Sequence, residues 1–153
     1  MKLIAHRGLI YGPNGQLENN PSQIESVLKQ GFDVEVDVWY QQGQWFLGHD
    51  RPTYMVDFDF LKQPGLWIHA KNLDALYALG STILNYFWHQ KDDFTLTSEG
   101  FIWTYPNMPL TAHSICVMPE WEDIEFKNLP EYCYGICSDY VSNPNFQRLI
   151  TRS

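Results

Sequence analysis

Hydrophobic and polar residues alternate most regularly over residues 32–39. One set of alternating positions is filled by valines and the other by carboxylates, which predicts a β-strand with one apolar and one acidic face. The valines are Val34, Val36 and Val38, and the carboxylates are Asp33, Glu35 and Asp37. Short apolar runs near residues 3, 47, 68, 85, 102, 116 and 136 predict seven further strands.

Helix signals are fewer and lie mainly in the first half of the chain. Asn20 followed by Pro21 predicts a helix start, and Gly31 its end. A second helix is expected between Asn72 and Gly80, and a third over residues 145–151. The second helix is expected to face inward through Leu73, Leu76 and Tyr77. Beyond residue 80 the strand-like runs continue with one short helical turn expected over residues 119–133.

The order of these elements favours an α/β fold. Strand, helix, three strands and helix follow one another in the first 80 residues, which is typical of parallel strands joined by crossover helices. A chain of 153 residues without a linker-like segment predicts a single domain over residues 1–153.

Composition narrows the partners. The net charge is −8 with no basic run, which argues against nucleic acid and against an anionic membrane surface. No apolar run approaches the length of a membrane span, and the first residues lack a signal-peptide pattern. The three cysteines match no common zinc or redox spacing, so they are expected to be reduced and buried in a cytoplasmic protein. The aromatic share of 16% suggests that some rings line a cleft or an interface.

Polar side chains with catalytic chemistry stand where the predicted strands end. In parallel α/β sheets, functional groups gather at the carboxyl ends of strands. Any one polar residue at such a position also fits the start of a loop. These residues are His6, Asp37, His49, His69, Lys71, His89, Tyr105 and Asp139.

Glu35 and Asp37 are harder to explain as loop or surface residues. They share one strand face and are flanked by valines, and two like charges on a core face need a compensating cation. A bound divalent ion is one explanation, and a salt bridge with Arg7 or Lys71 is the other.

Four short motifs resemble those of a known family. His6-Arg7-Gly8, Glu18-Asn19, Glu35-Val36-Asp37 and His49-Asp50 follow one another in this order. Together they are similar to the motifs of the glycerophosphodiester phosphodiesterases, part of the phospholipase-C-like phosphodiesterases built on a TIM barrel. The resemblance is specific over residues 3–50. It implies metal-dependent hydrolysis of a small-molecule phosphodiester.

The resemblance also implies a role for each matching residue. His6 and His49 would be the catalytic acid–base pair. Glu35 and Asp37 would bind Mg²⁺ or Ca²⁺. Arg7 would hold a phosphoryl oxygen, and Glu18 would support the metal or a substrate hydroxyl.

The next family motif, Glu-x-Lys, is His69-Ala70-Lys71 here. Lys71 can still contact the phosphate. His69 either ligates the metal, which would favour Mn²⁺ or Zn²⁺, or has a structural or substrate-binding role. This substitution motivates an alternative function, namely a catalytically degenerate barrel that binds a phosphorylated or sugar ligand without turnover. Aromatic residues near strand ends, including Trp88, Trp103 and Tyr105, motivate a third, sugar-processing or lyase reading, although they also suit a core or an interface.

Length is the largest departure from the family. A TIM barrel typically needs about 250 residues. We therefore expect a compact, helix-poor TIM-type barrel of seven or eight mostly parallel strands, either closed by short strands or incomplete and finished by oligomerisation. Apolar flanks left by absent helices would favour a homodimer, covered by some of five tryptophans: Trp39, Trp67, Trp88, Trp103 and Trp121.

Overall fold

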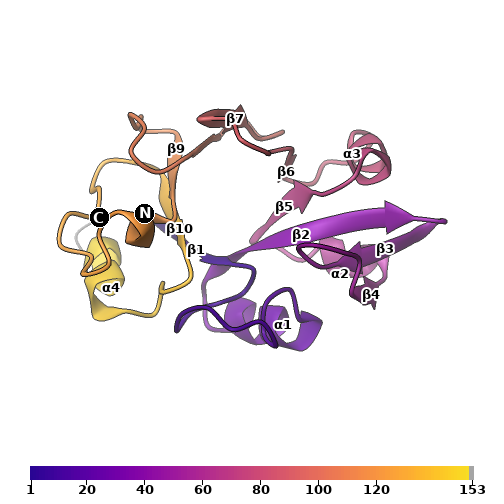
Figure 1. Cartoon of the computed structure of the whole chain (residues 1–153), viewed down its shortest axis with the longest axis horizontal. Helices are drawn as coiled ribbons and strands as arrows, with labels where there is room; N and C mark the ends of the chain where they lie inside the picture. The colour runs from indigo at the N-terminus through magenta and orange to yellow at the C-terminus, as the bar shows by residue number, and fades with distance from the viewer. Residues whose placement is uncertain (152–153) are drawn as a thin grey trace.

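The computed structural model describes residues 1–151 and has a mixed α/β architecture, with one curled sheet and few helices (Figure 1). The strands are β1 (Lys2–His6), β2 (Asp33–Gln41), β3 (Gln44–Leu47), β4 (Tyr54–Val56), β5 (Leu66–Ala70), β6 (Tyr86–Phe87), β7 (Phe94–Leu96), β8 (Ile102–Thr104), β9 (Ser114–Val117) and β10 (Gly135–Ser138). The helices are α1 (Pro21–Lys29), α2 (Phe58–Leu61), α3 (Leu73–Leu79), the 3₁₀ turn η1 (Pro119–Trp121) and α4 (Pro144–Thr151).

Parallel pairing runs through most of the sheet. The parallel strands are neighbours in the order β6, β5, β2, β1, β10, β9 and β8. In Figure 1, β1 lies at the centre, with β2 and β5 on one side and β10 and β9 on the other. All eight predicted strand positions are confirmed. Two further strands were not predicted: β4 pairs antiparallel with β3, and β7 with β8.

The sheet stays open between β6 and β8. Within residues 1–151 no strand ladder joins these two strands. Ser98, in the turn between β7 and β8, bridges the interval instead. Its N–H donates to the Tyr86 carbonyl oxygen at 2.8 Å, and its hydroxyl oxygen accepts from the Tyr86 N–H at 2.9 Å. The pairings therefore show a curled, mixed sheet rather than a continuous ring of strands.

The two faces of the sheet pack differently. The valine face of β2 is fully buried in the larger core, together with Ile24 and Val27 of α1. The other face turns into the curl, where side chains from six strands form a second core. Its members are Ile4, Trp67, Phe87, Trp103, Ile115, Val117, Met118 and Cys137. Glu35 and Asp37 of β2 belong to this inner side, so the alternation read from the sequence separates a helix-covered face from the interior of the curl.

Two sequence expectations about side-chain placement need correction, and the first concerns helix α3. Leu73 and Tyr77 do not face inward, since they are 74% and 85% exposed. Helix α3 packs through Ala75 and Leu79 instead, two residues one turn apart on its opposite side.

Trp67 and Trp103 do not cover an outer flank. They are buried in the inner core, with ring centroids 6.1 Å apart. Large inward side chains fill the interior of the curl. Among the described residues, Trp121 is the only exposed one of the five named tryptophans.

The predicted helix caps are confirmed, and the predicted burial of the cysteines is confirmed in part. The Asn20 side chain accepts hydrogen bonds at the start of α1, and Asn72 does so at the start of α3. The three cysteines are free, with Cys133 and Cys137 buried and Cys116 half-buried. None of the helices within residues 1–151 combines the length and the apolar character that crossing a bilayer requires.

Candidate functional site

The parallel register brings the predicted site residues together at the carboxyl ends of the central strands. His6 of β1 stands opposite Glu35 of β2, and Asp37 of β2 stands opposite His69 of β5. Residues in register on neighbouring parallel strands place their side chains on the same face. Four residues that lie up to 63 positions apart in the sequence therefore form one cluster.

The centre of this cluster is the acidic pair Glu35 and Asp37, which are 2% and 1% exposed. The Nδ1 atom of His69 lies 3.2 Å from Asp37 Oδ1 and 3.6 Å from Glu35 Oε1. One ligand atom from each of the three residues lies within 4.8 Å of the others. This is a donor set of two carboxylates and one imidazole that could hold a metal ion.

The hydrogen bonding of His69 suits this use. Its Nε2 lies 2.9 Å from the His89 carbonyl oxygen. A carbonyl can only accept, so Nε2 carries the proton, and the neutral ring presents the lone pair of Nδ1 to the carboxylates. A metal-ligating histidine commonly donates its other N–H to such a carbonyl. The residues therefore fit a divalent cation, and the imidazole ligand favours Mn²⁺ or Zn²⁺ over Mg²⁺ or Ca²⁺.

A proton can take the same position. Burial disfavours the charged form of His69, but its contacts with Asp37 and Glu35 outweigh burial and raise its pKa to about 9. Either a proton or a metal ion on Nδ1 thus compensates the buried carboxylates.

Basic side chains also surround Asp37, as the alternative explanation expected. Arg7 Nε lies 3.2 Å from Asp37 Oδ2, and Lys71 Nζ lies 3.8 Å from Oδ1. His49 Nδ1 lies 3.4 Å from Oδ2. Burial would raise the pKa of Asp37, but His49, His69 and Arg7 lower it well below its usual value. Asp37 therefore takes part both in these salt bridges and in the candidate metal-binding group.

Asn19 fixes the position of Asp37 in a way that the sequence did not reveal. Its side-chain N–H donates to Asp37 Oδ2 at 2.9 Å, and its oxygen accepts from the Asp37 backbone N–H at 2.9 Å. Asn19 was recognised only as the second letter of the Glu18-Asn19 motif. The sequence does not show that Asn19 is buried. At 1% exposure its side chain needs hydrogen-bond partners, and burial would have identified it.

The backbone after β1 is bent to bring Arg7 back over the cluster. Arg7 has a positive φ of 53°, which is uncommon for a residue with a side chain. Its N–H donates to Glu35 Oε2 at 3.1 Å, and its guanidinium donates to Glu18 Oε2 at 3.1 Å. Arg7 is therefore held between Glu18 and the acidic pair. Glu18, which was expected to support the metal or a substrate hydroxyl, contacts Arg7.

His6 is oriented by a carboxylate from the far end of the chain. Its Nδ1 lies 2.8 Å from Asp139 Oδ1. A carboxylate accepts, so Nδ1 carries the proton in the neutral ring, and the lone pair of Nε2 points toward Glu35, 3.9 Å from its Oε2. Burial lowers the pKa of His6, while Asp139 and Glu35 raise it, and the net shift is upward.

Asp139 is in turn held by Glu120, which sequence reasoning missed. Glu120 Oε1 accepts from the Asp139 backbone N–H and from the Ser138 hydroxyl, both at 2.9 Å. Burial raises the pKa of Glu120. Glu120 lies three residues beyond β9, in η1, whereas Asp139 follows β10 directly, so the strand-end pattern that identified Asp139 does not point to Glu120.

His49, the second predicted acid–base residue, stands at the exposed side of the cluster. Besides its contact with Asp37, its Nε2 lies 3.6 Å from Asp50 Oδ1. Gly48 makes this approach feasible, because a Cβ at that position would collide with the Arg51 carbonyl oxygen. The indole N–H of Trp39 donates to the Gly48 carbonyl oxygen at 2.6 Å and holds the turn.

Of the other strand-end residues, His89 and Tyr105 lie further from the carboxylates. The His89 ring is 6.3 Å from the His69 ring and 5.6 Å from that of Tyr105. Neither ring nitrogen of His89 has a hydrogen-bond partner in the described part of the chain. Burial lowers the pKa of His89. Its backbone carbonyl, which orients His69, makes the closer contribution to the cluster.

Comparisons with protein-family models, with curated proteins and with solved structures find no match for this chain. The assignment of a function therefore depends on the chemistry of the cluster itself.

Proposed function

We propose that this chain is a metal-dependent phosphodiesterase that hydrolyses a small glycerophosphodiester-like molecule on a compact, TIM-type barrel. The observation that carries the proposal is the parallel register that places His6 beside Glu35 and Asp37 beside His69. It brings the proposed general base, the candidate cation ligands and cationic side chains together at one end of the sheet, and the resemblance of the four motifs supports the same chemistry.

Glu35, Asp37 and Nδ1 of His69 would hold the divalent cation. When bound, such an ion neutralises negative charge that develops on the phosphoryl group in the transition state. The buried position of the two carboxylates strengthens this interaction, because water screens it less.

The two histidines supply proton transfer. His6 accepts the proton of the attacking hydroxyl on Nε2 while Asp139 holds its Nδ1–H, so that the ring keeps one tautomer. The oxygen of that hydroxyl forms a bond to phosphorus, and the bond from phosphorus to the leaving oxygen breaks. His49 then donates a proton to the leaving alkoxide. When the attacking hydroxyl belongs to the substrate, the first product is a cyclic phosphate. Water then attacks its phosphorus with the roles of the two histidines reversed, and the ring P–O bond breaks to complete the hydrolysis.

Arg7 and Lys71 bind the phosphoryl oxygens. Both already stand within ion-pair distance of Asp37. Arg7 can present its guanidinium to a phosphate once it exchanges its contact with Glu18 for the substrate. This exchange would also free Glu18 to contact a substrate hydroxyl.

A binding function without turnover is the second candidate. Two observations favour it: His69 stands where the resembling family has a glutamate, and Arg7 is already engaged by two carboxylates. Such a protein would bind a phosphorylated or sugar ligand at the same cluster.

The test is hydrolysis of glycerophosphodiesters in the presence of Mn²⁺, Mg²⁺, Ca²⁺ or a chelator. We expect activity with Mn²⁺ that the chelator abolishes, and a loss of about 10²–10⁴-fold for His6→Asn and for His49→Asn. His113→Asn is the matched control, since His113 is an exposed histidine outside the cluster. The variant His69→Glu should shift the preference toward Mg²⁺.

Three results would count against the proposal. Activity that survives the chelator would contradict the role of the metal. Unchanged rates for His6→Asn and His49→Asn would contradict the acid–base roles of the two histidines. Tight binding of glycerophosphodiesters without hydrolysis under any metal would establish the binding function instead.

A further inference from the structure

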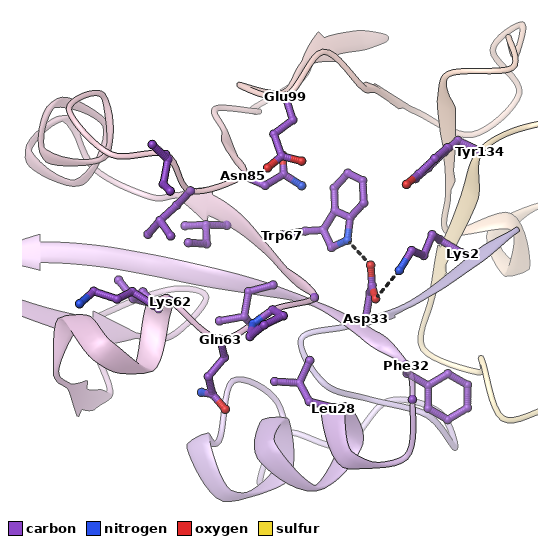
Figure 2. A pocket seen from close by; sticks show the side chains of 18 residues that line it. Lys2, Leu28, Phe32, Asp33, Lys62, Gln63, Trp67, Asn85, Glu99 and Tyr134 are labelled. Atoms are coloured by element: carbon purple, nitrogen blue, oxygen red, sulfur yellow. Dashed lines mark hydrogen bonds and ion pairs between the residues drawn. The ribbon is translucent and has the colours of Figure 1, made fainter.

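At each end of the sheet, a carboxyl group outside the cluster is shielded from solvent. Asp33 lies in the wall of a pocket of about 530 Å³ at the amino ends of the strands (Figure 2). Both of its oxygens have a partner, since Lys2 Nζ lies 3.3 Å from Oδ1 and the Trp67 indole N–H donates to Oδ2 at 3.0 Å. At the carboxyl ends, Glu120 Oε2 is buried without a hydrogen-bond partner among residues 1–151. Asp33 is therefore explained by its own contacts, whereas the presence of a carboxyl group at Glu120 needs another reason.

The backbone after β9 is bent so that Glu120 reaches the end of β10. Met118 has a positive φ of 48°, its side chain packs in the inner core, and its N–H donates to the Cys137 carbonyl oxygen at 2.8 Å. A residue with a side chain keeps such a conformation only where its surroundings fix it, and conformations of this kind cluster at functional sites. The turn η1 follows directly and carries Glu120.

Glu120 is one of three groups that fix Asp139. Its Oε1 accepts from the Asp139 backbone N–H at 2.9 Å, and the Asp139 carbonyl oxygen accepts from the Gly12 N–H at 2.8 Å. The Asp139 carboxylate lies 2.8 Å from Nδ1 of His6. The backbone of Asp139 is thus held on both sides of the side chain that orients His6.

Glu120 acts in these contacts as an acceptor. Its Oε1 also accepts from the Ser138 hydroxyl at 2.9 Å, and the Ser138 oxygen accepts from the Tyr140 N–H at 3.0 Å. Burial raises the pKa of Glu120, and the charge of Asp139 acts in the same direction. A protonated carboxyl group keeps one acceptor oxygen. Glu120 can therefore hold Asp139 without placing a second negative charge beside it.

We propose that Glu120 is a positioning residue for the general base: it holds Asp139 where the Asp139 carboxylate fixes the Nδ1–H tautomer of His6 and leaves Nε2 free to accept a proton. Without Oε1 of Glu120, two buried donors would lose their acceptor, which is unfavourable, so the backbone at Asp139 would move. The catalytic consequence rests on the proposed function, in which His6 is the base, whereas the tautomer is a property of the protein without substrate.

The experiment is ¹⁵N NMR of the labelled histidines in the presence of a chelator, at an alkaline pH where the His6 ring is neutral. We expect the Nδ1–H tautomer in the wild type and a mixture of both tautomers in Glu120→Leu. Glu120→Gln should keep the wild-type tautomer, because its side-chain oxygen can accept the same two hydrogen bonds. Glu122→Leu is the matched control, since Glu122 is exposed and directly follows η1.

Hydrolysis gives a second measurement on the same variants. If the Nδ1–H tautomer falls to about one molecule in ten in Glu120→Leu, kcat should fall about tenfold with little change in KM, because the substrate contacts remain. Glu120→Gln and Glu122→Leu should keep the wild-type kcat.

An unchanged His6 tautomer in folded Glu120→Leu would overturn the proposal, and so would a mixture of tautomers in Glu120→Gln. If Glu120→Leu does not fold, Glu120→Asp takes its place. Its carboxyl group is one methylene further from Asp139, so the tautomers should again be mixed, and an unchanged tautomer would overturn the proposal.

The two measurements separate this inference from the proposed function. Absence of hydrolysis in the wild type, with the tautomer changed in Glu120→Leu, would contradict only the phosphodiesterase. Hydrolysis in the wild type, with the tautomer unchanged in Glu120→Leu, would contradict only the role of Glu120.

Discussion

His69 shows how the type of a single residue affects the chemistry of a site. Its Nε2–H is committed to the His89 carbonyl, so Nδ1 alone can face Glu35 and Asp37. A glutamate at this position would add a third negative charge, whereas the imidazole adds a neutral donor or a positive charge. The cluster therefore carries less negative charge than three carboxylates would, and it suits softer divalent ions.

The thiol of Cys116 gives a prediction at this scale that is independent of the cluster. Burial raises its pKa to about 12. At pH 8 about one thiol in ten thousand is then ionised in the folded protein, against a substantial fraction for an unperturbed thiol of pKa about 8.5. Only the thiolate is nucleophilic, so alkylation by iodoacetamide at pH 8 should be at least about a hundredfold slower in the folded protein than in urea.

Mass spectrometry of the peptide that contains Cys116 follows this reaction. The peptide should remain unlabelled in the native protein, and a rise from pH 7 to pH 9 should leave the rate low, because both values lie well below the raised pKa. Native labelling as fast as labelling in urea would contradict the shift.

At the scale of residues, the sequence predicted which side chains lie close together but not the residues that hold them in place. His6, Glu35, Asp37 and His69 could be identified because strand ends and alternation point to them. Asp139 was recognised without a partner, because nothing local connects it with His6 across 133 positions. Asn19 and Glu120 act through burial and through contacts with other strands, which residue type alone does not reveal.

At the scale of elements, β2 organises the molecule. Its valines pack against the helices, its carboxylates line the inner side of the curl, and its edges pair with β1 and β5. The end of β2 is fixed to the start of α3 by Asn72. The oxygen of this side chain accepts from the Tyr40 and Ala75 N–H groups, and its N–H donates to the Tyr40 carbonyl oxygen.

This double role predicts a difference between two helix-capping asparagines. Asn20→Ala removes a cap alone and should lower the free energy of unfolding by about 1 kcal/mol. Asn72→Ala removes a cap and two hydrogen bonds to Tyr40, and should lower it by about 2–3 kcal/mol. Urea denaturation of the two variants and the wild type measures both values. Equal losses would show that the Tyr40 contacts do not stabilise the fold.

Strands and helices with strong local signals could be predicted at this scale. The eight predicted strands and the starts of α1 and α3 follow from alternation, apolar runs and capping residues. Strands β4 and β7 stand at the ends of the strand order and contain no buried residue, so no core-facing apolar run marks them in the sequence. The predicted inner face of α3 was wrong for Leu73 and Tyr77, which are exposed, whereas Leu76 is half-buried against the core as expected.

At the scale of the whole molecule, the curl of the sheet separates two ends. Polar and ionised groups gather at the carboxyl ends of the strands, an aromatic core fills the middle, and the pocket beside Asp33 opens at the amino ends. The sequence predicted mostly parallel pairing of the strands from crossover connections. It could not predict the interval between β6 and β8, because this depends on the contact of Ser98 with Tyr86 rather than on any strand pattern.

The most direct test of the account is a crystal structure of the protein soaked with Mn²⁺ and phosphate, with anomalous diffraction recorded at the manganese edge. The account predicts one anomalous peak about 2.0–2.3 Å from Glu35, Asp37 and Nδ1 of His69, with phosphate in contact with Arg7 or Lys71. An empty cluster at saturating Mn²⁺, with Arg7 and Lys71 still paired to Asp37, would contradict it.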